Sequence, residues 1–331
     1  MIKVGQIGIG HNHGEAVMRT VRRFPELFEV IGYSEENEEW LRRRAGKPGY
    51  ENLPRLTEDE IIERSDAVIV ETDVWNLTAT AKKCIDAGNP VHMDKPASGT
   101  MEEYKALLDA AEKKGLPLQL GYMYRYNPAV IKCMEWQKEG RFGDIYSIHA
   151  EMNTCHDAAS RRWHGNFNGG VHYILGSPLV DLIVWFLGKP VKVTSFLQHS
   201  GKDGVDVPDN NLSVLEYPNA LARIVVSSVD VDGHSRRSFV ISGSKATAAI
   251  LPMEPPAMTY SDLSIATNAF ENHSVPVELV SNGRRYDQMM KDFHDFVVGK
   301  KENPYSYAHE YAVQEVLSEV VGGVRMLGNK I

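Results

Sequence analysis

The most restrictive feature of this sequence is a regular alternation of short apolar runs with helical patterns over the first 122 residues. The apolar runs cover residues 3–9, 28–33, 67–70, 91–93 and 116–122, and helical spacing is found at 14–23, 36–44, 77–87 and 101–114. Apolar strands separated by helices form parallel sheets that are covered on both faces, with right-handed crossovers. The sequence therefore predicts an α/β domain with a doubly wound sheet over residues 1–122.

The pattern changes after residue 122. A helix-like segment at 128–139 is followed by strand-like segments separated by turn residues, at 146–152, 191–199, 212–217, 221–229, 239–242 and 246–251. Helical patterns at 286–298 and 308–327 close the chain, and 201–209 and 252–264 are expected to be mobile loops. Consecutive strands favour antiparallel pairing, so residues 123–331 are predicted to form an α+β domain with a mainly antiparallel open sheet.

Charge and cysteine content restrict the partners. The 36 Lys and Arg residues are outnumbered by 44 Asp and Glu residues, and the resulting net charge of −8 repels nucleic acid and anionic membranes at long range. The three cysteines show no C-x-x-C spacing, which argues against a disulfide framework and a structural zinc site. Without a signal-peptide pattern or a long apolar run, a cytoplasmic protein is expected, with no nucleic-acid or membrane partner.

A glycine-rich turn joins the first strand to the first helix. Its sequence is Gly8-Ile9-Gly10-His11-Asn12-His13-Gly14, in which the third glycine comes one residue later than in the usual G-x-G-x-x-G pattern. Gly8 permits a tight turn, Gly10 admits a pyrophosphate, and the helix N-terminus offers N–H groups to that anion. Dinucleotide binding is predicted here, with a plain tight turn as the alternative. His11 and His13 are interpreted as parts of the cofactor turn, and no metal site is predicted.

The end of the second strand bears on the choice between NAD and NADP. Glu35 follows Ser34 at the position where an acidic residue hydrogen-bonds the ribose hydroxyls and repels a 2′-phosphate. Alternatively, Ser34 with Arg42 or Arg43 folded back could accept that phosphate. The sequence modestly favours NAD.

A second group of polar residues, Asp94-Lys95-Pro96, follows the strand at 91–93. It therefore lies at the carboxyl edge of the sheet, where open α/β folds bind ligands. A lysine beside a cationic nicotinamide ring would have its proton affinity lowered, and it could donate a proton or orient a substrate. The alternative is an ordinary surface lysine at a strand end.

These residues and several others resemble the glucose-fructose oxidoreductase / inositol dehydrogenase / MocA (Gfo/Idh/MocA) family. The resemblance covers nearly the whole chain, through the glycine turn, 66–70, 87–92, 94–96, 121–128, Gly169-Gly170, Asp181, Trp185, 187–188 and 243–245. It implies an NAD(P)-dependent dehydrogenase of a sugar, sugar derivative or cyclitol, with a Rossmann domain and a carboxyl-terminal domain whose open sheet forms a homo-oligomer, a dimer or tetramer.

The resemblance also implies roles for individual residues. Lys95 carries over as the active-site lysine, and Asp94 replaces the usual glutamate. The residues expected along the cofactor are Thr72, Asp73, Val74, Trp75 and Asn76, and those expected to line the substrate pocket are Tyr124, Arg125 and Trp163.

The sequence departs from the family where a proton must be moved. The family's usual aspartate and histidine, four residues apart, are replaced by Ile174 and Pro178. The candidate replacements are His172 and Tyr173 in the same segment, and His156 and His164 in the preceding loop. With His149, these histidines are clustered, but no H-E-x-x-H or i, i+4 pair indicates a metal site.

Three functions remain open. The first is hydride transfer between NAD(P) and a carbohydrate or cyclitol hydroxyl, with Lys95 and either His172 or His164 as catalytic residues. The second is a glycoside-processing enzyme in which bound NAD is reduced and reoxidised within each cycle. The third is a non-catalytic, dinucleotide-binding regulatory protein, which the replacements Ile174 and Pro178 would suit.

Overall fold

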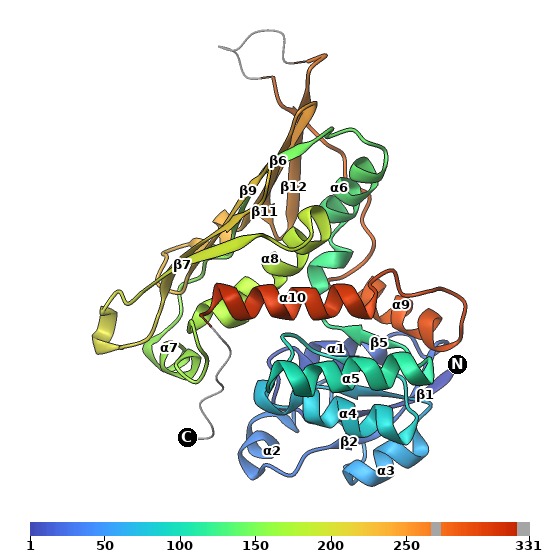
Figure 1. Cartoon of the computed structure of the whole chain (residues 1–331). Coiled ribbons are helices and arrows are strands. Elements are labelled where there is room, and N and C mark those ends of the chain that lie inside the picture. Colours follow the sequence, from blue (N-terminus) through green and yellow to red (C-terminus); the bar gives the residue numbers. More distant parts are fainter. Residues whose placement is uncertain (266–272, 323–331) are drawn as a thin grey trace. The chain divides into compact units, whose positions relative to one another are not determined.

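The computed structural model describes residues 1–265 and 273–322, which form two compact units (Figure 1). The first unit comprises Met1–Met123 and Asn282–Tyr311, and the second comprises Tyr124–Ser281 and the chain from Ala312 onward. Residues 282–311 belong to the first unit because hydrogen bonds attach them to it. Gln119 donates to the carbonyl of Met289, and Tyr307 donates to the carbonyl of Leu116. Whether 1–122 and 123–331 fold as separate domains stays a prediction.

A five-stranded parallel sheet, in the order β2-β1-β3-β4-β5, forms the centre of the first unit. Its strands are β1 (Ile2–Ile7), β2 (Phe28–Ser34), β3 (Ala67–Val70), β4 (Val91–Met93) and β5 (Leu118–Leu120). Its helices are α1 (Gly14–Val21), α2 (Glu38–Arg44), α3 (Glu58–Arg64), α4 (Leu77–Ala87), α5 (Met101–Lys114) and α9 (Asp287–Val297). Every residue of β3 and β4 is buried, which explains why β3 is wholly apolar; β4 carries one buried polar residue, His92.

Local signals define several of these helices. Thr57 and Thr100 each form a capping box, with Glu60 and Glu103 respectively. The left-handed residues Gly88 and Gly115 end α4 and α5. The predicted boundaries of α4 and α5 are therefore confirmed.

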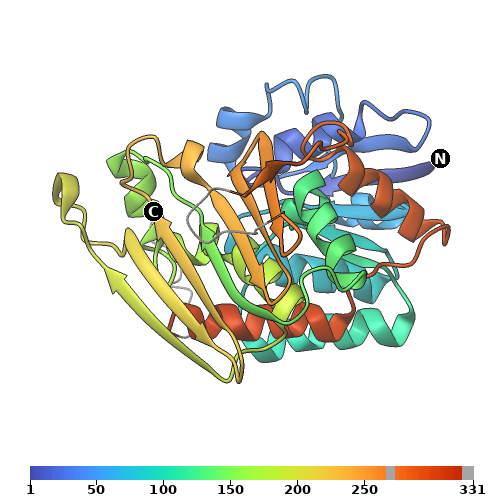
Figure 2. The ribbon, with the colours of Figure 1, turned by 90° about the horizontal axis from the view of Figure 1, so that it is seen from above.

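An eight-stranded sheet, in the order β13-β12-β11-β10-β6-β9-β8-β7, forms the second unit (Figure 2). Neighbouring strands are antiparallel except for the parallel pair β6–β9, so the predicted fold class is confirmed. The strands are β6 (Ile145–Glu151), β7 (Lys192–Gln198), β8 (Asn210–Glu216), β9 (Leu221–Ser227), β10 (Ser238–Gly243), β11 (Ala246–Met253), β12 (Pro256–Asp262) and β13 (Val275–Pro276). The helices are α6 (Pro128–Lys138), α7 (Ala158–His164), α8 (Val171–Leu187) and α10 (Tyr307–Val320), the last of which begins in the first unit.

Some sequence expectations were wrong. Residues 252–264, expected to be a mobile loop, contain the end of β11 and all of β12, because the turn at Glu254-Pro255 is short enough to pair these strands. Helices α3, α7 and α8 were not predicted; α3 and α7 are short, and α8 is apolar on nearly every side and shows no helical period. The predicted final helix is described only to Val320 as α10, and residues 323–327 of that prediction lie outside the described part of the chain.

Across 1–265 and 273–322, no helix is both long and apolar enough to span a bilayer.

Candidate active site

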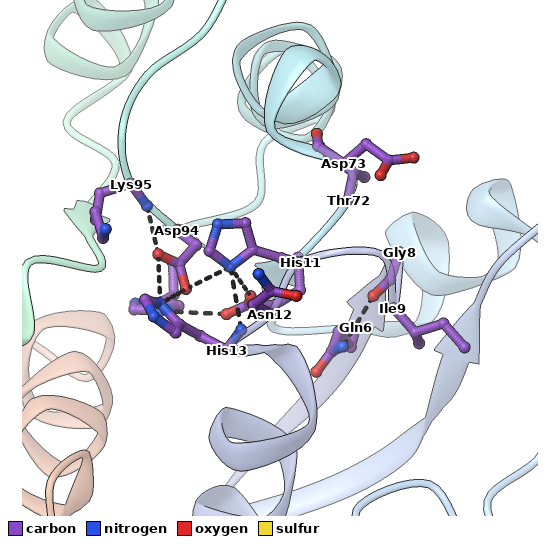
Figure 3. Close-up of polar contacts among 12 residues, drawn as sticks. Gln6, Gly8, Ile9, His11, Asn12, His13, Thr72, Asp73, Asp94 and Lys95 are labelled. Carbon is purple, nitrogen blue, oxygen red and sulfur yellow. Dashed lines mark hydrogen bonds and ion pairs between the residues drawn. The ribbon is translucent and has the colours of Figure 1, made fainter. Parts of the chain in front are cut away.

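The glycine turn lies at the carboxyl edge of the parallel sheet, between β1 and α1. Gly8 has φ +81°, and its N–H donates to the carbonyl of Ser34 at the end of β2 (2.7 Å). A Cβ at Gly8 would lie 2.5 Å from Thr72 Cα, and one at Gly10 would lie 3.0 Å from the Asp73 nitrogen. The two glycines thus let the turn approach the loop that follows β3 (Figure 3).

The close approach of Gly8 to Thr72 leads to a prediction about the stability of the fold. We expect Gly8→Ala to lower the free energy of unfolding by about 2 kcal/mol, because it adds left-handed strain and a clash with Thr72 backbone. Gly46→Ala is the control, since no atom lies within 4 Å of a Cβ at that position. Urea unfolding measures both, and equal losses in the two variants would contradict the explanation.

Glu35 is fixed against the turn. Its Oε2 accepts a hydrogen bond from the Ile9 N–H (2.9 Å), and its Oε1 accepts from the N–H groups of Glu36 and Asn37 (3.0 and 2.9 Å). The carboxylate is therefore held beside the glycine turn at the end of β2, while the Ser34 side chain is buried.

Arg44 is a residue of this site that sequence reasoning missed. Its guanidinium donates to the carbonyls of Ile9 and His11 and to Asn12 Oδ1, and it lies 4.6 Å from the Trp40 ring centroid. The two arginines proposed from sequence are placed differently, because Arg43 pairs with Glu39 (3.0 Å) and Arg42 is exposed. The available signal was helical spacing, since position 44 follows Trp40 by one turn of α2.

The loop after β3 adjoins the glycine turn. Asp73 Oδ2 accepts a hydrogen bond from Trp40 Nε1 (2.9 Å), and Val74–Asn76 form a short 3₁₀ helix that leads into α4. Burial raises the pKa of Asp73. The structure thus brings Thr72 and Asp73 to the glycine turn, whereas Asn76 is exposed.

A buried group of ionisable side chains lies where β1, β3 and β4 end (Figure 3). His13 Nδ1 is 2.9 Å from Asp94 Oδ2, and His11 Nδ1 is 3.2 Å from the same oxygen. His11 Nδ1 is also 3.4 Å from Glu71 Oε2. We call these four residues the His–carboxylate cluster. Sequence reasoning missed Glu71. This residue directly follows the apolar strand β3, and a single acidic residue at a strand end does not stand out in a search for helical or strand periodicity.

The carboxylates and histidines of this cluster perturb one another's pKa values. Burial alone would lower the pKa of His11, but Asp94 and Glu71 raise it to about 9. Burial, with the charges of His11 and Lys95, lowers the pKa of His13 to about 4 despite Asp94. Burial and the charge of Asp94 raise the pKa of Glu71 to about 8, whereas the two histidines overcome the effect of burial and hold the pKa of Asp94 well below its usual value.

Lys95 follows this cluster directly. Its main-chain N–H donates to Asp94 Oδ1 (2.6 Å), and the residue is only 3% exposed. A buried position at the carboxyl edge, next to the glycine turn's partner Asp94, argues against an ordinary surface lysine.

In the second unit, Arg125 is held by Asp181. Arg125 Nε lies 3.1 and 3.0 Å from the two carboxylate oxygens, and Nη2 lies 2.6 Å from Oδ1. Both side chains are 1% exposed. Tyr124, the other pocket residue expected from this segment, donates to Met152 Sδ. Their substrate contacts stay a prediction.

Three of the predicted site residues lie together: His156 and Trp163, predicted to contact substrate, and His164, predicted to be catalytic. The rings of His156 and His164 stack with centroids 5.1 Å apart, and the Trp163 ring lies 5.4 Å from that of His164. His172 is placed elsewhere: it is fully buried in α8, where its Nε2 is 2.9 Å from Ser213 Oγ of β8. Ile174 and Pro178 lie on α8 as well, and Pro178 is buried.

These histidines are neutral at physiological pH. Burial and the charge of His156 lower the pKa of His164 to about 3, and burial lowers the pKa of His172 to about 3. Burial and the charge of Arg237 also lower the pKa of His156. The neutral imidazole is therefore the favoured form of all three, and burial makes His164 and His172 weaker bases than a free histidine.

The parallel sheet, the glycine turn and the acidic residue after β2 define the class. Residues 2–122 match the family described as "Oxidoreductase family, NAD-binding Rossmann fold", and 130–249 match the "GFO/IDH/MocA C-terminal domain". The protein is thus an oxidoreductase with an NAD-binding Rossmann fold. More specifically, the chain belongs to the Gfo/Idh/MocA family, as its motifs predicted.

Relatives and solved structures agree with this assignment. An uncharacterized oxidoreductase of Schizosaccharomyces pombe is 26% identical over 82% of this chain and 78% of its own length. The scyllo-inositol 2-dehydrogenase (NADP(+)) IolW of Bacillus subtilis is 31% identical over 43% of this chain and 40% of its own length.

Among solved structures, the UDP-N-acetylglucosamine 3-dehydrogenase GnnA of Acidithiobacillus ferrooxidans has a TM-score of 0.80 at 18% identity, covering 97% of both chains. The WlbA dehydrogenase of Bordetella pertussis, solved with NADH and UDP-GlcNAcA, has a TM-score of 0.77 at 17% identity and covers 99% of both chains. At these identities the likeness shows the fold.

Proposed function

We propose that the protein is an NAD(P)-dependent dehydrogenase that oxidises or reduces a hydroxyl-bearing carbon of a sugar, sugar derivative or cyclitol. The observation that carries the proposal is the position of Lys95, buried at the carboxyl edge of a Rossmann sheet and joined through Asp94 to the glycine turn. The names of relatives that act on inositol and on nucleotide sugars support the substrate class.

The residues at this edge fit a dinucleotide. Gly8 holds the tight turn, the N-terminus of α1 faces the turn, and Glu35 is fixed beside Ile9, where it can accept hydrogen bonds from ribose hydroxyls. Thr72 and Asp73 adjoin the same turn. When bound, the nicotinamide supplies the hydride acceptor or donor.

The protein's own groups would then bind the substrate and move its proton. Lys95 orients the substrate hydroxyl and takes part in proton transfer. Both His164 and His172 are buried, but Nε2 of His172 is already paired with Ser213 Oγ, so we favour His164, stacked on His156, for the proton-transfer role. Trp163 lies against the same pair and supplies an apolar face for a sugar ring.

The position of Glu35 leads to a prediction about cofactor choice. We expect NAD to bind more tightly than NADP, and Glu35→Ser to shift the ratio of the two dissociation constants by about tenfold toward NADP, because the carboxylate that repels a 2′-phosphate is removed. Calorimetric titration measures both constants. Glu36→Ser, at the next and exposed position, is the control; an equal shift in that variant would remove Glu35 from cofactor selection.

The activity is tested in two steps. Mass spectrometry of gently purified protein identifies any retained nucleotide, and a panel of sugars, nucleotide sugars and cyclitols is then tested for reduction of NAD and NADP. We expect at least one polyol or sugar to give reduced nicotinamide. Binding of cofactor without reduction across the panel would count against a dehydrogenase.

A second function is favoured by the absence of the usual proton-transfer pair. With Ile174 and Pro178 at those positions, a glycoside-processing reaction in which NAD is reduced and reoxidised in each cycle would release an aglycone without net NADH. Assaying the same panel for a released leaving group separates the two enzymes, while a non-catalytic regulatory protein would show neither signal.

A homo-oligomer, dimer or tetramer, is proposed from the open sheet of the second unit. Residues such as Ala150, Ile224 and Ile241 on one face of this sheet are buried, while the opposite face carries Phe196 and Leu221, which are 51% and 56% exposed. Sedimentation of the full chain tests this assembly. A cytoplasmic location stays a prediction.

A further inference from the structure

The His–carboxylate cluster brings donor atoms from three segments to one point. The distances are 3.4 Å from Glu71 Oε2 to His11 Nδ1, 3.2 Å from His11 Nδ1 to Asp94 Oδ2, and 2.9 Å from Asp94 Oδ2 to His13 Nδ1. The donor atoms of His11, His13 and Asp94 all lie within 4.8 Å of one another. Both histidines use Nδ1, and both direct it at the same carboxylate oxygen.

These distances suit a tetrahedral ion. With bonds of about 2.0–2.1 Å from zinc to nitrogen or oxygen, neighbouring ligand atoms are about 3.3 Å apart. The three distances between successive donors in the cluster are close to this value. Two imidazoles with one or two carboxylates are ligands that a divalent transition ion accepts.

Glu71 gives independent support for a cation. It is 0% exposed, and within residues 1–265 and 273–322 neither of its carboxylate oxygens accepts a hydrogen bond. Its Oε2 faces His11 Nδ1, and its Oε1 is 3.9 Å from His92 Nε2. A buried carboxylate without hydrogen bonds is costly unless a positive charge lies beside it; the imidazolium of His11 supplies that charge in the metal-free protein, and a bound cation would replace it.

The orientation of His92 strengthens this argument. Gln119 Nε2 donates to the carbonyl of Met289, so Gln119 Oε1 is the atom that faces His92 Nδ1 at 2.8 Å and accepts its proton. His92 Nε2 is then a lone-pair acceptor, and it too accepts no hydrogen bond in the described structure. Two acceptors, Glu71 Oε1 and His92 Nε2, therefore face each other beside the cluster.

We propose that His11, His13 and Asp94, with Glu71 as a fourth ligand, bind one divalent transition-metal ion of the zinc class. The ion would join the β1–α1 turn to the ends of β3 and β4. The Asp94 carboxylate is already oriented by the Lys95 N–H, and the His13 side chain, 21% exposed, leaves a route for entry. This site departs from the sequence expectation, which included no metal and assigned both histidines to the cofactor turn.

The test uses the full chain without a polyhistidine tag. Protein is dialysed against a chelator, freed of it, and titrated calorimetrically with ZnCl₂; metal content after gel filtration gives the stoichiometry. We expect one equivalent of zinc and a rise of several degrees in Tm over the chelated protein. Co²⁺ in place of zinc should give the intense visible absorption of a four-coordinate site.

Variants locate the ion. His13→Gln removes a partly exposed ligand and should weaken zinc binding about 100-fold and abolish the Co²⁺ band, and Asp94→Asn should do the same. His149→Gln, at an exposed histidine of the second unit, should leave both unchanged. The proposal is overturned if the wild-type protein neither binds zinc nor gives the Co²⁺ band, or if His13→Gln weakens binding no more than His149→Gln. The cluster is then held by protons and hydrogen bonds alone.

Discussion

Replacing Lys95 with Ala should lower kcat/KM of the proposed dehydrogenase by about 10²- to 10⁴-fold, while the dissociation constant of the nicotinamide cofactor changes far less. Lys95 is buried beside Asp94, which the cluster ties to the glycine turn, so its ammonium has a defined place at the edge where α/β sheets bind ligands. Its loss removes a positioned charge rather than a binding surface for the dinucleotide.

Two further variants make this test specific. Lys95→Met keeps most of the side-chain volume, so a loss equal to that of Lys95→Ala would assign the effect to the missing ammonium rather than to a cavity. Lys113→Ala, an exposed position on α5, should retain the wild-type rate. Unchanged turnover in both Lys95 variants, measured with a substrate found in the panel, would remove this residue from the mechanism.

Sequence periodicity predicted the first unit better than the second. The strands of the parallel sheet are short and mostly apolar, and capping residues such as Thr100 and Gly115 define the helices between them. In the second unit, α8 is buried on almost every side and therefore lacks an amphipathic period, while the prolines at 252, 255 and 256 suggested a loop, although they lie at or beside the turn between β11 and β12. Local sequence cannot indicate what a segment packs against.

The same limit applies to the candidate site. The glycine turn, Glu35 and Lys95 could be found because each stands at a fixed place in a strand–turn–helix unit. Glu71 and Arg44 were missed, because their importance comes from contacts across strands and from a helix folding over the turn; helical spacing relative to Trp40 was the single hint for Arg44. The histidines illustrate a further difficulty: His172 and His164 look alike in sequence, but one is bound to Ser213 in the core and the other is stacked on His156.

Arg125 shows how a predicted pocket residue can also hold the fold. Its guanidinium makes a bidentate contact with Asp181 of α8, and neither side chain is exposed by more than 1%. Removing one member of a buried ion pair is far more damaging than removing both, because the remaining charge stays buried without its partner. Solvent and salt screen an exposed pair, which therefore contributes little.

We therefore expect Arg125→Met to lower the free energy of unfolding by about 3–5 kcal/mol, as measured by urea denaturation followed by tryptophan fluorescence. Arg223→Met, which breaks the partly exposed pair with Glu151 (3.0 Å) in the same unit, should cost less than about 1 kcal/mol. The double variant Arg125→Met/Asp181→Leu should recover much of the loss, since it removes both charges of this pair together. If Arg125→Met costs no more than Arg223→Met, the guanidinium is not needed to hold Asp181, and we would then assign the buried charge of Arg125 to substrate binding instead.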